Sequence, residues 1–164
     1  MENPQPQNPE TSRNGRPAWR TAVAAGVIAS IVFQLLEILL IPRFGGGSPW
    51  GPARMIAAIV MGRGVLPPPA TFELSIVLVA LAVDIVLAVI YTAVLGWLIH
   101  YWSLGWSLTV GAVFGVLLYL INFYCFTAIF PWFEMGRNGV TLFTHVVFSL
   151  TAALAYKKLQ VHSA

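Results

Sequence analysis

Four apolar stretches, each long enough to cross a lipid bilayer as a helix, limit what this chain can fold into. A hydrocarbon core of about 30 Å requires roughly 20 mostly apolar residues in a helix. The only carboxyl and imidazole groups in these stretches belong to Glu37, Asp84 and His145. The pattern predicts an all-α membrane protein with four transmembrane helices in a bundle. The expected spans are residues 22–41, 74–98, 108–130 and 140–156.

The composition agrees with an integral membrane protein. Of the 164 residues, 58% are hydrophobic and 9% are charged, whereas an ordinary soluble domain has about 25% charged residues. A soluble fold of this size has more surface than so few charges can cover. We therefore expect the lipid bilayer to surround most of the chain. The basic residues are scattered and form no stripe interleaved with stacking aromatics, so nucleic acid is not an expected partner.

Sequence motifs for catalysis or metal binding are absent. The segment GGSPW at residues 46–50 lacks the second glycine of a nucleophile elbow. No P-loop lysine follows the glycines, and there is no HExxH motif. The single cysteine, Cys125, excludes an intramolecular disulfide, and His100, His145 and His162 lie too far apart in the sequence to form a metal site. We expect no catalytic residue, no metal and no cofactor, and we do not expect an enzyme.

The polar ends and the long connection between the first two spans complete the domain organisation. Residues 1–18 are expected to be a disordered tail, 19–158 the transmembrane domain and 159–164 a second short tail. In the connection, the apolar residues 55–61 are too few to span a bilayer. Pro52 suits the first turn of a helix. We expect a short helix here that lies in the interface or re-enters the membrane, where protein would cover its ends.

Basic residues near the ends of the spans indicate the orientation. Four spans place both termini on one side, and the first span, which usually dominates orientation, is preceded by three arginines. The basic residues on the side of the termini are Arg13, Arg16, Arg20, Lys157 and Lys158, and those on the other side are Arg43, Arg54, Arg63 and Arg137. We therefore expect both termini in the cytoplasm.

The two halves of the chain show a weak similarity. Residues 26–42 align with 115–131, two intervals that begin at glycine and end at proline, and residues 84–88 align with 145–149. One interpretation is a duplication of a helical hairpin, with the two copies related by an axis along the membrane normal. The other is chance, because apolar helices align easily. The sequence leaves both open.

Each span carries small and polar residues at intervals of three and four, which places them on one helix face. Small residues let helices approach closely, and polar ones require partners that lipid does not provide. We expect these faces to point into the bundle, either for packing alone or to form a polar intramembrane site. The candidate residues for this site are Gln34, Glu37, Asp84, Asn122 and His145.

The depth of the three ionisable groups predicts specific pairs. A rise of about 1.5 Å per residue places Asp84 near the bilayer midplane, where an ionised carboxylate requires a partner, water or a proton. If Asp84 and His145 occupy equivalent places in the two halves, they would meet near the bundle axis. This pair would either bind and release a proton near neutral pH or only fix the helix register. Glu37 lies close enough to the interface to reach Arg43 or Arg54.

Charged residues above these groups form a second candidate site. They come from the two connections on the side away from the termini. One interpretation is a vestibule that binds an anion or a zwitterion, and the other is a network of interfacial salt bridges. The members are Arg43, Arg54, Arg63, Glu134 and Arg137.

Three motifs resemble the YagU-like family of small bacterial inner-membrane proteins. They are Pro42-Arg43 at the exit of the first span, Pro131-Trp132-Phe133-Glu134, and FTHVVF at residues 143–148. The resemblance implies a four-helix protein of the bacterial inner membrane without an established reaction. Members are sometimes labelled sodium:proline symporter-like, although this chain is far too short for such a transporter. In the family a histidine stands at the position of Asp84, and the linker from Glu134 to His145 is shorter.

These observations predict one of two functions. The first is a small transport or permeation protein, forming a homo-oligomer because four helices rarely enclose a pathway. The second is a non-transporting accessory subunit that organises a larger membrane complex with a membrane-protein partner. A continuous cavity from the arginine cluster to Asp84 would favour the first, and dry, fully packed surroundings would favour the second.

Overall fold

The computed structural model describes residues 19–162, and within this range the regular secondary structure is entirely helical. The long helices are α1 (Trp19–Leu40), α3 (Leu74–Ile99), α4 (Leu104–Leu120) and α5 (Gly139–His162), and the short helix α2 (Gly51–Met61) lies between α1 and α3. Four helical segments are long and apolar enough to cross a membrane. The predicted four-helix membrane fold and the short helix between the first two spans are confirmed.

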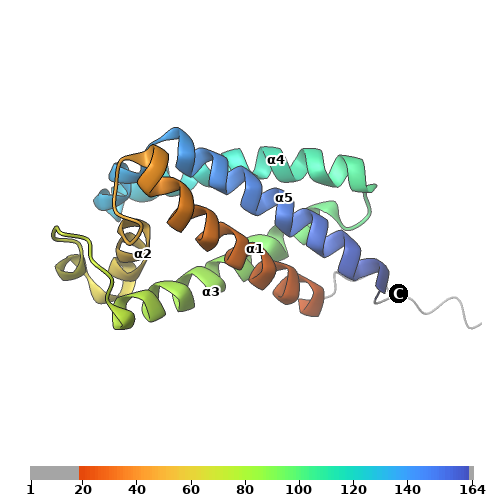
Figure 1. The fold of residues 1–164 in the computed structure, drawn as a ribbon. Coiled ribbons are helices and arrows are strands. Elements are labelled where there is room, and N and C mark those ends of the chain that lie inside the picture. The colour runs from red at the N-terminus through yellow and green to blue at the C-terminus, as the bar shows by residue number, and fades with distance from the viewer. Residues whose placement is uncertain (1–18, 163–164) are drawn as a thin grey trace, which may run out of the picture.

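The four long helices pack in a fixed order across the bundle. Helix α5 packs along both α4 and α1, and α1 also packs along α3, whereas α3 and α4 meet only slightly. In Figure 1, α1 and α5 cross the middle of the bundle, with α3 and α4 on opposite sides. The start of α1 and the end of α5 lie at the same end of the bundle (Figure 1), as an even number of spans requires. We call this the terminal end, and the opposite end, which carries α2, the α2 end.

Two glycines determine how closely the helices approach. A Cβ atom at Gly26 would lie 2.9 Å from the Cα atom of Val89, and one at Gly115 would lie 2.7 Å from the carbonyl oxygen of His145. Real Cβ atoms do not come this close to backbone atoms, so α1 against α3 and α4 against α5 require glycine at these crossings. Other small residues of the predicted helix faces are also buried, including Ala22, Ala88, Ser107 and Ser149. The small-residue faces therefore point into the bundle as expected.

The two predicted hairpins are present, but their packing is not two-fold symmetric. An axis relating the α1–α3 hairpin to the α4–α5 hairpin would make the α1–α5 and α3–α4 contacts equal. Instead α1 and α5 pack extensively while α3 and α4 barely touch. The packing therefore lends the duplication no support, and it stays a prediction from the sequence.

Irregular turns end α1 and α4 at the α2 end. A π-helical turn, Ile41–Gly45, follows α1 at Pro42, whose missing N–H removes a helical hydrogen bond. The π-helical turn Ile121–Cys125 and the 3₁₀ turn Phe126–Ala128 follow α4. The third span, Leu104–Ala128, includes these irregular turns and ends two residues before the expected residue 130. A further 3₁₀ turn, Pro131–Gly136, leads into α5.

Helix α2 covers the α2 end of the bundle. Its Ala57 packs against Ile76 and Ala80 of α3, while Met55 and Ile59 pack against a cluster formed by Tyr119, Phe123 and Phe133. The turn Arg63–Val65 follows α2. Other parts of the protein therefore cover two faces of α2.

The predicted chain ends are only partly described. The expected tail at residues 1–18 lies outside the described residues, as do residues 163 and 164. Residues 159–162 were expected in the second tail, but they continue α5, which ends at His162.

Candidate functional site

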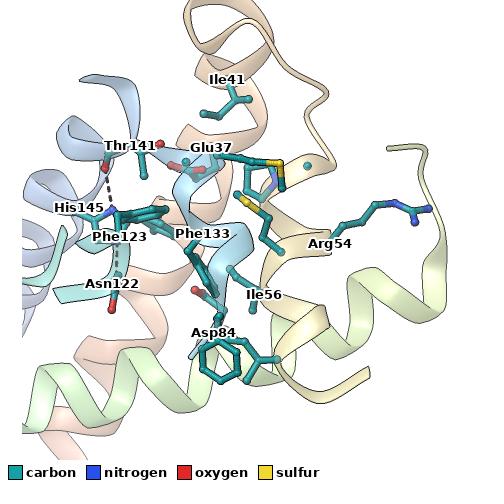
Figure 2. A pocket seen from close by; sticks show the side chains of 18 of the residues that line it. Glu37, Ile41, Arg54, Ile56, Asp84, Asn122, Phe123, Phe133, Thr141 and His145 are labelled. Carbon is teal, nitrogen blue, oxygen red and sulfur yellow. Dashed lines mark hydrogen bonds between the residues drawn. The ribbon is translucent and has the colours of Figure 1, made fainter. Parts of the chain in front are cut away.

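A cavity of about 510 Å³ lies between the helices at the α2 end. It extends from loop residues Ser48, Pro68 and Ala70 to Asp84 and Ala88 in the middle of α3. Most of its wall is apolar, with aromatic rings from α1, α5 and the turns that follow α4. The polar side chains that line it include Glu37, Asp84, Tyr91, Asn122, Thr141 and His145. Figure 2 shows Glu37 and Asp84 on either side of Phe133, with His145 and Asn122 to one side.

Glu37 joins α1 to α5 rather than to an arginine. Its side chain is 3% exposed, and the Thr144 hydroxyl lies 2.5 Å from Oε1. The same hydroxyl donates to the carbonyl oxygen of Thr141 at 3.0 Å. A hydroxyl carries one proton, so Thr144 shares it between the Glu37 carboxyl and this carbonyl oxygen. The expected contact of Glu37 with Arg43 or Arg54 was wrong, because the carboxyl ends beneath the π-helical turn and faces α5.

Asp84 is held by α1. Its Oδ2 accepts a hydrogen bond of 2.6 Å from the Ser30 hydroxyl, and the Gln34 amide is a second hydrogen-bonding neighbour. Asp84 is buried, and its charge is close enough to Glu37 for the two to interact. The carboxyl in the middle of α3 therefore has polar partners, as expected, but within residues 19–162 no cationic side chain forms an ion pair with it.

His145 belongs to a different chain of hydrogen bonds. Its Nδ1 lies 2.8 Å from the carbonyl oxygen of Thr141, which only accepts, so Nδ1 carries a proton. Its Nε2 lies 3.3 Å from Nδ2 of Asn122, and Oδ1 of Asn122 accepts a hydrogen bond from Tyr91 at 3.1 Å. These partners assign a neutral imidazole whose Nε2 accepts from the Asn122 amide.

The expected Asp84–His145 pair is therefore wrong. Both residues line the same cavity, but Asp84 hydrogen-bonds to α1 and His145 to the end of α4 and its own helix. The proton-binding role that rested on their direct contact has no support in this geometry.

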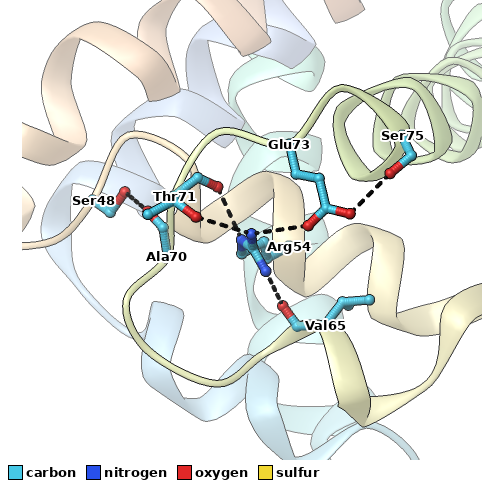
Figure 3. Close-up of polar contacts among 7 residues, drawn as sticks. All are labelled: Ser48, Arg54, Val65, Ala70, Thr71, Glu73 and Ser75. Carbon is cyan, nitrogen blue, oxygen red and sulfur yellow. Dashed lines mark hydrogen bonds and ion pairs between the residues drawn. The ribbon is translucent and has the colours of Figure 1, made fainter.

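Arg54 is a structural clamp. Its side chain is 10% exposed, and it donates to the carbonyl oxygens of Val65 at 2.8 Å and Thr71 at 3.1 Å. Glu73 Oε2 lies 3.5 Å from Nη2, and Figure 3 shows these partners around the guanidinium group. In Figure 2 the side chain points away from Glu37 and Asp84. Arg54 therefore fastens the loop after α2 to the start of α3.

Arg137 closes the end of α4 in a similar way. It donates to the carbonyl oxygen of Phe123 at 2.7 Å, to Glu134 Oε1 at 2.8 Å and to Thr127 Oγ1 at 3.2 Å. Its guanidinium carbon lies 4.5 Å from the ring centroid of Tyr124. The carbonyl groups near the end of a helix lack partners within the helix, and Arg137 supplies one.

The predicted anion vestibule is wrong. Of its five members only Arg54 lines the cavity, and its donors bind loop carbonyls. Arg63 lies over the ring of Trp132, 5.6 Å from its centroid, and Arg43 is exposed. With the Arg137–Glu134 bridge, these contacts match the alternative interpretation of an interfacial network.

Several site residues were missed from the sequence. Thr144 and Tyr91 supply hydrogen bonds to the candidate groups. The sequence spacing places Tyr91 and Ser30 on the predicted polar faces, but it does not indicate which residues they hydrogen-bond to. The aromatic wall gave no signal, because phenylalanine is common on the lipid face of any span.

Comparisons with protein-family models, with curated proteins and with solved structures found no match to this chain. The resemblance to YagU-like proteins therefore rests on the three sequence motifs.

Proposed function

We propose that this multi-pass membrane protein is a small transport or permeation protein, and that the cavity at the α2 end is its solute-binding site. The observation that carries the proposal is the reach of the cavity, from loop residues Ser48 and Ala70 to Asp84 in the middle of a membrane-spanning helix. A subunit whose polar faces only pack would fill this space with side chains.

The distribution of polar groups supports the proposal. Polar side chains reach the cavity from all four spans, with Glu37 on α1, Asp84 on α3, Asn122 after α4 and His145 on α5. Ionisable groups within membrane spans mark solute pathways when they face a cavity rather than lipid. The solute would thus contact every helix of the bundle.

The cavity ends near Asp84. Beyond it, towards the terminal end, the core is closed by buried side chains that include Ala25, Leu95, Ala152 and Tyr156. Transport therefore requires a second conformation or a pathway completed by another subunit, and we propose a homo-oligomer. We further propose that the protein lies in the bacterial inner membrane with both termini in the cytoplasm. The cavity then opens away from the cytoplasm.

A flux assay in proteoliposomes tests this function. Purified protein is reconstituted, and uptake of radiolabelled cationic, anionic and neutral amphiphilic solutes is compared with that of empty liposomes. We expect protein-dependent uptake of at least one solute, reduced at least tenfold in Asp84→Asn and Glu37→Gln. Glu134→Gln neutralises a carboxyl outside the cavity and serves as the matched control, with unchanged uptake.

Two results would contradict the proposal. One is uptake no greater than in empty liposomes for every solute. The other is recovery of the chain from mild detergent in a defined complex with a larger partner, which favours the accessory role. A monodisperse homomer would count against that role.

A further inference from the structure

We propose that the cavity binds an organic monocation with an apolar body. For its biological role this inference rests on the proposed function, but the binding itself does not. The carboxyls of Glu37 and Asp84 line the cavity and lie close enough for their charges to interact. Ionised carboxyls in an apolar wall repel each other and require a partner, so these two favour a positively charged ligand in the cavity.

The protein does not supply this positive charge. Within residues 19–162, Arg54 and His145 are the only basic side chains that line the cavity. The guanidinium group of Arg54 is bound to two loop carbonyls and to Glu73. The imidazole of His145 donates through Nδ1 to Thr141 and accepts from Asn122, an arrangement that fits its neutral form. A cationic ligand would supply the charge that these side chains do not.

The wall indicates that the cation is organic. Hard metal cations take six or more oxygen ligands, and within the described residues no group of three or more acidic, histidine or cysteine side chains is placed to hold a metal ion. Aromatic rings that line the cavity include Phe33, Phe123, Phe126, Phe130, Phe133 and Phe148. Aromatic faces attract organic cations, and apolar side chains favour the rest of such a molecule.

The size of the cavity agrees with this class of ligand. A volume of about 510 Å³ falls within the range of about 300–1,000 Å³ that is typical of sites for small organic molecules. The carboxyls are held by Ser30 and Thr144 from neighbouring helices, so their positions are determined before a ligand enters. The site is therefore pre-organised for one charged group with an apolar body beside it.

Equilibrium binding to the full detergent-solubilised chain tests the inference. The probes are tetraphenylphosphonium and the smaller benzyltrimethylammonium, with tetraphenylborate as an anion of the same shape as the larger probe. We expect saturable binding of at least one cation. Glu37→Gln and Asp84→Asn should each weaken it at least tenfold. Asp84→Glu retains the charge and should restore most of the affinity, and Glu134→Gln should leave it unchanged.

Three results would overturn the inference, provided that thermal unfolding shows the variants to be folded. They are no saturable binding of either cation, equal binding in the Glu37→Gln/Asp84→Asn double variant, and competition by tetraphenylborate as strong as by the cation. Carboxyl-dependent binding without any flux would support this inference and contradict transport. Flux of another solute without cation binding would do the reverse.

Discussion

At the terminal end of the bundle Tyr156 fills the space beside Gly96, whereas at the α2 end Glu37 and Asp84 line a cavity. The Tyr156 hydroxyl lies 3.1 Å from Nδ1 of His100, and Lys157 donates to the carbonyl oxygen of His100 at 3.0 Å. Both ends thus bury polar side chains on facing helices. His100, Tyr156 and Lys157 hydrogen-bond to one another in a packed core, while the polar groups at the α2 end line a cavity.

This difference teaches that a polar helix face alone does not identify a site. Side-chain volume decides between the two outcomes, because a ring placed against glycine closes a gap that smaller side chains leave open. Changing side-chain volume or polar contacts at one end at a time therefore tests this comparison.

The largest loss of stability is expected at Gly115, where the backbones of α4 and α5 lie against each other. Gly115→Ala places a Cβ atom 2.7 Å from both the carbonyl oxygen of His145 and the Cα atom of Val146. Helices α4 and α5 must separate, which should lower the free energy of unfolding by about 3 kcal/mol. Unfolding in detergent, followed by circular dichroism, measures the loss. Gly105→Ala in the same helix meets nothing within 4 Å, so it should cause no loss, and equal effects of the two would contradict the assignment.

The next largest effect is expected from added side-chain volume, which should destabilise the terminal end more than the α2 end. Ala153→Phe introduces a ring at a fully buried position of the terminal half and should destabilise the protein by about 2 kcal/mol. Val83→Phe directs the same ring towards the cavity that Val83 lines, so it should change stability by less than about 1 kcal/mol. The same unfolding measurement compares them. A larger loss for Val83→Phe would show that the cavity is not available space.

Removal of the Arg54 clamp at the α2 end should cause a smaller loss of stability. Arg54→Ala leaves the carbonyl oxygens of Val65 and Thr71 without their donors, and a loss of about 1–2 kcal/mol is expected. The loop between α2 and α3 should also become sensitive to proteolysis. Arg43→Ala removes an exposed arginine at the same end and should be neutral within about 0.5 kcal/mol. Unchanged proteolysis in Arg54→Ala would mean that the loop is held by other contacts.

The smallest effect is expected at the terminal end. Lys157→Met removes a donor to the carbonyl oxygen of His100, at the C-terminus of α3, while Tyr156 still packs against Gly96. A loss of about 0.5 kcal/mol is expected, the usual value for a cation at a helix C-terminus. Thermal unfolding checks it. A loss as large as that of Ala153→Phe would show that polar contacts, not packing, hold this end together.

The long helices were predictable because length and hydropathy are local properties of the sequence. The same holds for α2, where Pro52 and the apolar residues 55–61 mark a short helix. The π-helical turn after Leu40 contains Pro42, which marks the end of the helix but not the type of turn. The turn after Leu120 was not predictable, because it depends on how Phe123 packs against Phe133 and α2 at this end, and no local pattern records that packing.

The sequence predicts which polar residues belong to the candidate site but not which of them are in contact. Sequence spacing gives the depth of Asp84 and His145, but their contact also depends on how each helix is rotated about its axis. Small residues determine that rotation, and Ser30 meets Asp84 at a position where His145 was expected. The partners of the arginines were not predictable, because Arg54 and Arg137 both donate to backbone carbonyls, which every residue possesses.

The π-helical turn Ile121–Cys125 also affects how related sequences should be aligned. Such a turn holds one residue more than the α-helical turn it replaces, so the helical phase of the chain slips between Leu120 and Phe126. A related chain with one residue fewer in this interval would form an ordinary α-helical turn here. Its later side chains would keep their places around the helix axis, so the gap in an alignment belongs within residues 121–125.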